Sequence, residues 1–183
     1  MYGRLYHYAG NNPVRYIDPD GEKTFYALIS LGEDELSGRL VATKYKLYQI
    51  ANAINDNTEH SATVIENATK EDFNKAFNDP DTSFIVVLGH GGTVLFEGIE
   101  TFEGEHFEPE DIEPDRSSQN IETVVFYSCY QTENYEEWEK HIPSASRIIT
   151  FEGVVRDETI HLHAIYDLDV LVYFTFGEIY KNE

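Results

Sequence analysis

A histidine and the chain's single cysteine each follow a short apolar run. Residues 84–88 lead through one glycine into His90, and residues 124–127 lead through one serine into Cys129. Runs this short, bounded by small residues, fit strands that are buried on both faces. In an open parallel sheet, ligands bind beyond the carboxyl ends of the strands. If the two runs are neighbouring parallel strands, His90 and Cys129 reach the same edge and are placed as base and nucleophile.

A cysteine nucleophile also needs a stabilised thiolate and donors for the oxyanion that forms during attack. Cys129 precedes a segment that we expect to be helical. A helix N-terminus and an imidazole both favour the thiolate, whereas the many acidic residues oppose it. Glycines around His90 let the backbone approach closely, so the N–H groups of Gly91 and Cys129 are the expected oxyanion donors. The competing interpretation is a buried structural cysteine, which is commoner for a lone Cys after a strand.

The composition limits the partners that the chain can have. Its 183 residues suit one globular domain with a small appendage. A net charge of −21 argues against binding nucleic acid, because phosphates would be repelled. One cysteine excludes a disulfide framework, a Cys-rich zinc site and the paired cysteines of deaminase zinc sites. No apolar run approaches the roughly 18 residues of a membrane span, and no signal peptide is evident.

Strand and helix patterns alternate from residue 23 onwards, which predicts an α/β fold. Strands are expected at 24–30, 62–65, 84–88, 121–127 and 147–151, and helices at 35–55, from Thr69 to about 78, and from Thr132 to about His141. Residues 97–119 are mostly polar and acidic, so we expect a surface loop, with a hairpin near 93–97. Residues 170–176 fit either a strand or a buried helix.

Two histidines near the C-terminus form a weak candidate for a metal site. His161 and His163 lie on one face if their segment is a strand. No third ligand follows at a spacing typical of metal sites, so we expect neither a metal nor another cofactor.

The first 21 residues differ from the rest, because tyrosines alternate there with Gly, Asn and Pro. Residues 5–21 resemble the end of the core of RHS/YD-repeat proteins, with Asn-Asn-Pro at 11–13 and Asp-Pro-x-Gly at 18–21. In that family the repeats form a β shell, and this tail marks the junction with a variable C-terminal toxin domain. The resemblance implies a core tail at residues 1–22 and an effector domain at residues 23–183. The autocleaving version of the tail has Leu where this chain has Glu22, which argues against self-release at this junction.

Residues 84–91 and 123–131, separated by a variable loop, resemble the caspase-like cysteine peptidases, the superfamily of caspases, gingipain, clostripain, separase and CHAT-type members. Residues 147–158 resemble the strand and acidic turn that follow the nucleophile in CHAT-type members. The resemblance implies a caspase-like three-layer α/β sandwich, with a mostly parallel central sheet flanked by helices. It also implies His90 as base and acid and Cys129 as nucleophile. Ser128 stands where the family usually has Ala or a similarly small residue.

The same resemblance directs attention to two acidic residues. Glu152 and Asp157 lie just past the strand after the nucleophile, where residues that determine specificity often fall in this superfamily. A carboxylate that points into the substrate pocket would favour Arg or Lys before the scissile bond. The competing interpretation is that Asp157 is an exposed helix cap.

The leading prediction is a cysteine endopeptidase that serves as the C-terminal toxin of an RHS-type polymorphic toxin. It would be secreted, delivered into the cytoplasm of a target cell, and would cleave proteins there. The resemblance implies an immunity protein as partner, and an RHS shell when the domain is part of a longer chain. The alternatives are an inactive caspase-like domain that binds a partner protein, and a dyad used for acyl transfer. By family analogy, the enzyme could also cut itself within residues 97–119.

Overall fold

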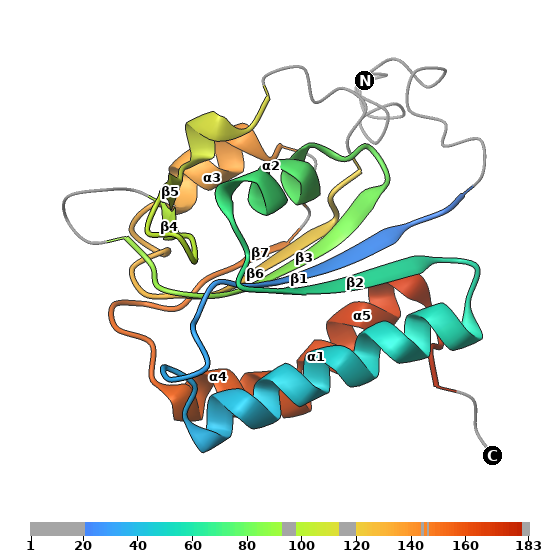
Figure 1. Cartoon of the computed structure of the whole chain (residues 1–183). Helices are drawn as coiled ribbons and strands as arrows, with labels where there is room; N and C mark the ends of the chain where they lie inside the picture. Colours follow the sequence, from blue (N-terminus) through green and yellow to red (C-terminus); the bar gives the residue numbers. More distant parts are fainter. Residues whose placement is uncertain (1–20, 93–97, 114–119, 144, 146, 181–183) are drawn as a thin grey trace, which may run out of the picture.

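The computed structural model describes residues 21–92, 98–113, 120–143, 145 and 147–180 (Figure 1). The segment that resembles an RHS core tail therefore lies outside the described residues, except for its last positions. The hairpin expected near residues 93–97 lies outside them as well.

A five-stranded parallel sheet forms the middle layer. Its strands run in the order β2 (Ser61–Glu66), β1 (Thr24–Ile29), β3 (Thr82–Leu88), β6 (Thr123–Tyr127), β7 (Arg147–Ile149). Every neighbouring pair is parallel. Every residue of β1, β3 and β6 is buried, as expected for apolar strands that are covered on both faces.

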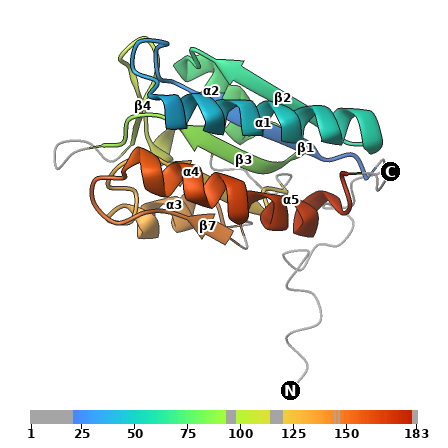
Figure 2. The same ribbon diagram turned by 90° about the horizontal axis from the view of Figure 1, so that it is seen from below.

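Helices cover both faces of this sheet (Figures 1 and 2). One face carries α1 (Gly38–Asn57), α4 (Asp157–Tyr166) and α5 (Leu168–Phe176), and the other carries α2 (Lys70–Asn78) and α3 (Tyr135–His141). This is a three-layer α/β sandwich with a parallel central sheet, so the predicted fold class is confirmed. The arrangement is consistent with a caspase-like sandwich.

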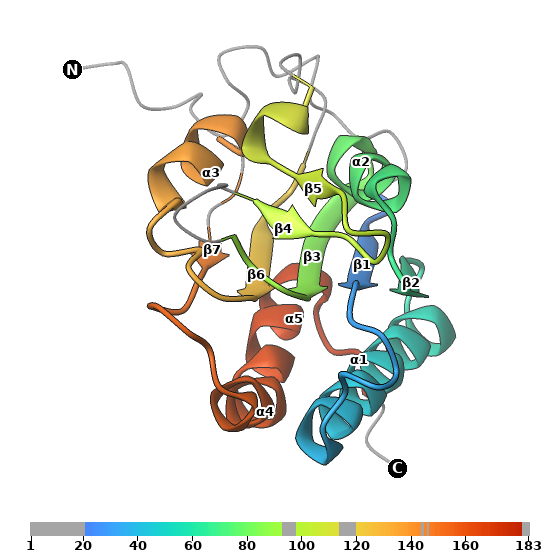
Figure 3. The same ribbon diagram turned by 60° about the vertical axis from the view of Figure 1, so that its left-hand side comes forward.

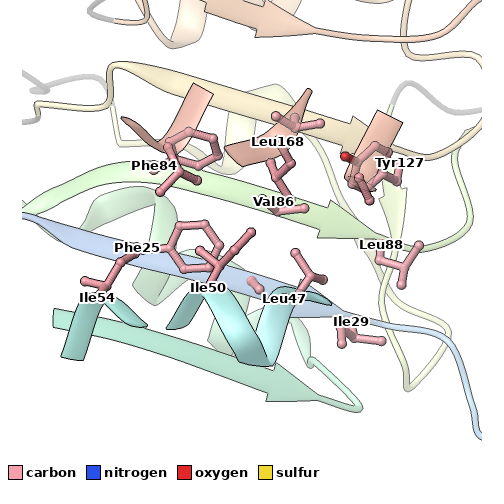
Figure 4. Close-up of a cluster of buried hydrophobic side chains, with 14 of the residues drawn as sticks. Phe25, Ile29, Leu47, Ile50, Ile54, Phe84, Val86, Leu88, Tyr127 and Leu168 are labelled. Atoms are coloured by element: carbon pink, nitrogen blue, oxygen red, sulfur yellow. The ribbon is translucent and has the colours of Figure 1, made fainter. Parts of the chain in front are cut away.

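Two hydrophobic cores lie on opposite sides of the sheet, because successive strand residues point to opposite faces. Phe25, Phe84 and Val86 pack toward α1 and α5 in the first core (Figure 4). The second core is aromatic and lies under α2 and α3. It includes Trp138, whose ring centroid lies 4.7 Å from that of Phe126.

Local sequence signals place the first two helices close to where they were expected. Thr69 and Asp72 form a capping box that starts α2, since the side chain of each accepts from the backbone N–H of the other. Ser37 caps α1, so this helix begins at Gly38 and leaves Glu35 in the loop before it.

The segment expected as a surface loop at 97–119 is partly a piece of the core. It contains the short strands β4 (Ile99–Glu100) and β5 (His106–Phe107) and the 3-10 turn η2 (Pro109–Asp111). Ile99 and Phe107 are fully buried in the second core. Figure 3 shows β4 and β5 on the side of the sheet that carries α2 and α3. The surface-loop prediction was wrong for these residues, because isolated apolar positions in a polar stretch show no period that would indicate burial.

The C-terminal part is helical, so the strand alternative for residues 170–176 was wrong. The helical period also separates His161 from His163, since residues two apart lie on different sides of a helix. In the described part of the chain, no group of three or more His, Cys, Asp or Glu side chains could hold a metal ion. None of the described helices is both long and apolar enough to cross a membrane.

A pair formed by the buried Tyr127 and the half-buried His163 joins β6 to α4. The hydroxyl of Tyr127 lies 2.8 Å from Nδ1 of His163. Burial, reinforced by the charge of Asp167, raises the pKa of Tyr127, so its hydroxyl keeps its proton and donates a hydrogen bond to the ring. Burial lowers the pKa of His163 against the opposing effect of Asp167, which favours a neutral ring with Nδ1 as acceptor.

This pair predicts that acid destabilises the fold. The pKa of His163 is lower in the folded chain than its ordinary 6.5, so the unfolded chain binds the proton more readily. The free energy of folding that the neutral His163 ring contributes is complete at pH values above the ordinary pKa. It is lost as the pH falls through the pKa of His163 in the folded chain. Urea unfolding measured from about pH 8 to 5 should show this loss, and His163→Asn, which keeps an acceptor but cannot titrate, should reduce it. An unchanged pH dependence in His163→Asn would contradict the assignment.

Candidate active site

The register of the sheet brings the predicted dyad residues to the same edge. Leu88 of β3 pairs with Tyr127 of β6, and His90 and Cys129 each lie two residues beyond these partners. The N–H of Gly89 donates to the carbonyl of Tyr127 at 3.3 Å, which extends the pairing past the strand ends. The two loops therefore leave the sheet side by side, as expected from the sequence.

Gly91 lies directly against the backbone of Cys129. A Cβ atom at Gly91 would lie 1.8 Å from the carbonyl oxygen of Cys129 and 2.6 Å from its nitrogen, far inside van der Waals contact. On its other side Gly91 forms an isolated antiparallel bridge with Ile99 of β4. Only glycine fits between these two neighbours, so the His90 loop packs tightly against the Cys129 loop.

The N–H groups of Gly91 and Cys129 are the predicted oxyanion donors. In the bridge to β4, the hydrogen bonds are made by the neighbours of Gly91: the N–H of Gly92 donates to Gly98, and the N–H of Glu100 donates to His90. Among the described residues, neither the Gly91 nor the Cys129 N–H donates a hydrogen bond. The predicted role requires both N–H groups to donate to a ligand oxygen, and no described residue competes for them.

The Cys129 thiol is partly exposed and has a backbone donor beside it. The N–H of Val155 donates to Sγ at 3.4 Å, and the N–H of Tyr130 donates to the carbonyl of Gly153 at 2.8 Å. Val155 and Gly153 both lie in the loop between β7 and α4, which donates one of these hydrogen bonds and accepts the other. Cys129 is thus not fully buried, and a hydrogen-bond donor lies at the sulfur, which becomes negative when the thiol is deprotonated.

The predicted helix start behind Cys129 lies further along the chain. Helix α3 begins at Tyr135 rather than at Thr132, whose hydroxyl instead pairs with that of Thr150 at 2.9 Å. A turn occupies the intervening residues. Asn134 takes the N-cap position that was expected for Thr132, so the helix start was wrong by two residues. That the helix N-terminus favours the thiolate stays a prediction.

The proposed specificity residues lie within the loop that touches the thiol and directly after it. Glu152 is exposed in this loop, and Asp157 is the first residue of α4, where a negative charge is favourable near the helix N-terminus. The N-cap position itself belongs to Arg156, so the cap interpretation of Asp157 was wrong by one residue.

Gln131 is a site residue that sequence reasoning missed. Its fully buried amide donates to the carbonyls of Gly98 and Cys129, both at 3.1 Å, and accepts from Trp138 Nε1 at 2.7 Å. These bonds tie the Cys129 turn to the start of β4 and to α3. A buried amide with three partners holds its surroundings in one arrangement.

Glu35 is a second residue that the sequence did not point to. One carboxylate oxygen lies 2.8 Å from Nε2 of His90, and the other accepts the N–H of Gly32 at 2.8 Å. The bonds from His90 and Gly32 lower the pKa of Glu35, so this carboxylate is ionised at neutral pH and can only accept. Nε2 of His90 therefore carries a proton, and Nδ1 is the acceptor nitrogen of the neutral ring.

The His90 ring and the Cys129 thiol thus lie on adjacent loops with separate partners. No hydrogen bond joins the two side chains within the described residues; the ring bonds to Glu35, and the sulfur accepts from Val155. Catalytic hydrogen bonds are often loose or absent without a substrate and tighten when it binds. The geometry places a thiol, an imidazole bonded to a carboxylate, and two backbone N–H groups without an acceptor among the described residues at one edge of the sheet.

Comparisons with known proteins identify no family for this chain. No family model matches the chain, and no curated protein matches it.

Proposed function

We propose that the chain is a cysteine endopeptidase in which Cys129 is the nucleophile and His90 is the general base and acid. The observation that carries the proposal is the contact between the two loops. The backbone of Gly91 lies against that of Cys129, which sets the two reactive residues side by side at matching strand ends. This is the relation that a nucleophile and its base require.

The chemistry follows from these positions. Nδ1 of His90 takes the thiol proton, and the sulfur of Cys129 attacks the scissile carbonyl carbon. The N–H groups of Gly91 and Cys129 donate to the resulting oxyanion. Collapse breaks the C–N bond, and His90 returns its proton to the leaving amine. Water, deprotonated by His90, then hydrolyses the thioester and releases the acid and the free thiol.

The acidic surroundings suggest a substrate preference. Glu152 lies in the loop that contacts the thiol and Asp157 directly follows it, and either carboxylate would favour Arg or Lys before the scissile bond. The resemblance of residues 1–22 to an RHS core tail supports a biological role as a C-terminal toxin. In this role the domain is delivered into a target cell, cleaves proteins in the cytoplasm and is countered by an immunity protein.

A second candidate is a caspase-like domain that binds a partner without catalysis. The separate partners of the two side chains favour it, since His90 is bonded to Glu35 and the sulfur accepts from Val155. In this interpretation the hydrogen bond between Glu35 and His90 holds the His90 loop in place as part of a surface that binds a partner protein.

Expression toxicity tests these two candidates. Wild type is expected to arrest cells and to cleave peptides that carry Arg or Lys before the scissile bond, while Cys129→Ala and His90→Ala do neither and keep the wild-type circular dichroism spectrum. Ser128→Ala is the matched control, because its buried hydroxyl has no partner among the described residues and its loss should leave activity intact. Equal behaviour of wild type and both dyad variants would reject the peptidase and favour the binding domain. An unchanged preference in a Glu152→Ala, Asp157→Ala double variant would reject the specificity assignment alone.

A further inference from the structure

The outer face of α4 and α5 is apolar and exposed. The side chains concerned share one side of the two consecutive helices, and we call them the α4–α5 stripe: Leu162, Ile165, Tyr166, Val170, Tyr173 and Phe174. They recur at intervals of three and four residues, so they form a continuous band. Figure 2 shows α4 and α5 one after the other beside α1, on the outside of the sheet.

The opposite side of the same two helices is already used by the core. Ile160, Ala164, Leu168 and Val172 are buried against the sheet and α1. Helix α5 has Asp169 as its one charged residue and is otherwise apolar on both sides apart from Thr175. A helix that is apolar all round is normally covered on all sides, and a large exposed apolar patch marks an interaction surface.

The charges around the stripe select the kind of partner. Residues 157–180 contain no Lys or Arg, and their acidic residues are Asp157, Glu158, Asp167, Asp169 and Glu178. Cations from other elements lie at the borders: Arg147 stands over the Phe174 ring, Lys46 pairs with Asp169, and Arg39 pairs with Glu158. The acidic excess near the stripe therefore rests on Asp157 and Asp167, within a chain of net charge −21. A second copy of this chain, with net charge −21, would be repelled, as would an anionic membrane surface.

We infer that the α4–α5 stripe is a docking surface for a protein whose contact face has an apolar centre ringed by Lys and Arg. The apolar centre covers Tyr166, Tyr173 and Phe174, which are 70%, 57% and 62% exposed, and the basic ring faces the acidic border. Aromatic side chains of this kind dominate the affinity of protein interfaces. This surface is independent of the proposed peptidase activity, since none of its residues touches His90 or Cys129.

An amphipathic helical peptide with a Trp/Leu face and Lys on its polar sides provides the probe. Fluorescence anisotropy should detect binding to the whole chain, weakened by added salt because charges contribute. Combined Tyr166→Ser and Tyr173→Ser should weaken binding on the order of tenfold or more. Tyr45→Ser is the matched control, because Tyr45 lies on α1, is 64% exposed and undergoes the same chemical change. It should bind as wild type does.

Several results would overturn this inference. The first is that the Lys peptide does not bind. The second is that a peptide with Glu in place of Lys binds as tightly as the Lys peptide. The third is that Tyr45→Ser weakens binding as much as the double substitution does. Light scattering that shows a wild-type dimer broken by the double substitution would assign the stripe to self-association instead. Binding to neutral lipid vesicles that the double substitution abolishes, without binding to the Lys peptide, would assign it to a membrane surface.

Discussion

Glu35→Gln is expected to lower the rate of peptide hydrolysis by about tenfold to a hundredfold. The carboxylate holds Nε2 of His90 at 2.8 Å and stabilises the imidazolium that forms when the thiol proton is taken. Where such a carboxylate is buried, as in a Ser-His-Asp triad, replacing it with the amide lowers the rate by roughly 10⁴-fold. The smaller effect follows because His90 and Glu35 are 55% and 45% exposed, so water screens their interaction.

The kinetic signature separates this positioning role from a structural one. Glu35→Gln should lower kcat and leave KM nearly unchanged, because Glu35 is expected to act on the base and not on the substrate. Glu35→Asp, which keeps the charge on a shorter side chain, should restore part of the rate. Glu33→Gln makes the same change at an exposed position nearby and serves as the control. A Glu35→Gln enzyme with the wild-type kcat would show that Glu35 does not position the base.

Gly91→Ala is expected to damage both stability and activity. The added Cβ would lie 1.8 Å from the carbonyl oxygen of Cys129, and both atoms belong to the backbone, so one loop must move. Overpacking of this kind costs about 1–3 kcal/mol of unfolding free energy. A displacement of about 1 Å at a reacting group lowers the rate by roughly a hundredfold, so hydrolysis should fall with it. Urea unfolding and peptide hydrolysis measure the two effects.

Gly38→Ala is the matched control for this prediction. Gly38 opens α1, and a Cβ there would meet no atom within 4 Å. Stability should be unchanged or raised, by at most about 1 kcal/mol from the better helix propensity of Ala. If Gly91→Ala were as stable and as active as Gly38→Ala, this result would contradict the close contact between the His90 and Cys129 loops.

The α/β sandwich and the placement of His90 beside Cys129 were predictable because their signals are local. An unbroken apolar run such as residues 84–88 indicates a strand buried on both faces, wherever its neighbours lie. Two such runs in a parallel sheet bring their carboxyl ends to one edge, so the register of Leu88 with Tyr127 follows from few assumptions. The capping box at Thr69 is local in the same way.

The partners of the dyad could not be predicted in this way. Glu35 reaches His90 across 55 positions, and Gln131 reaches Gly98 across 33, and neither residue differs in sequence from the many other polar residues around it. Buried Ile99 and Phe107 lie in a polar segment whose burial depends on the aromatic core that α2 and α3 build around them.

The sequence by itself therefore determined the class of fold, the order of its central elements and the edge that carries the reactive side chains. The tertiary structure alone decided what holds those side chains, and that the outer face of α4 and α5 is left exposed. The physical reason is range. The spacing of apolar residues, the position of glycines and the capping of helices shape the backbone over a few neighbouring positions. Hydrogen-bond partners and exposed faces instead depend on which distant segments meet in the folded chain.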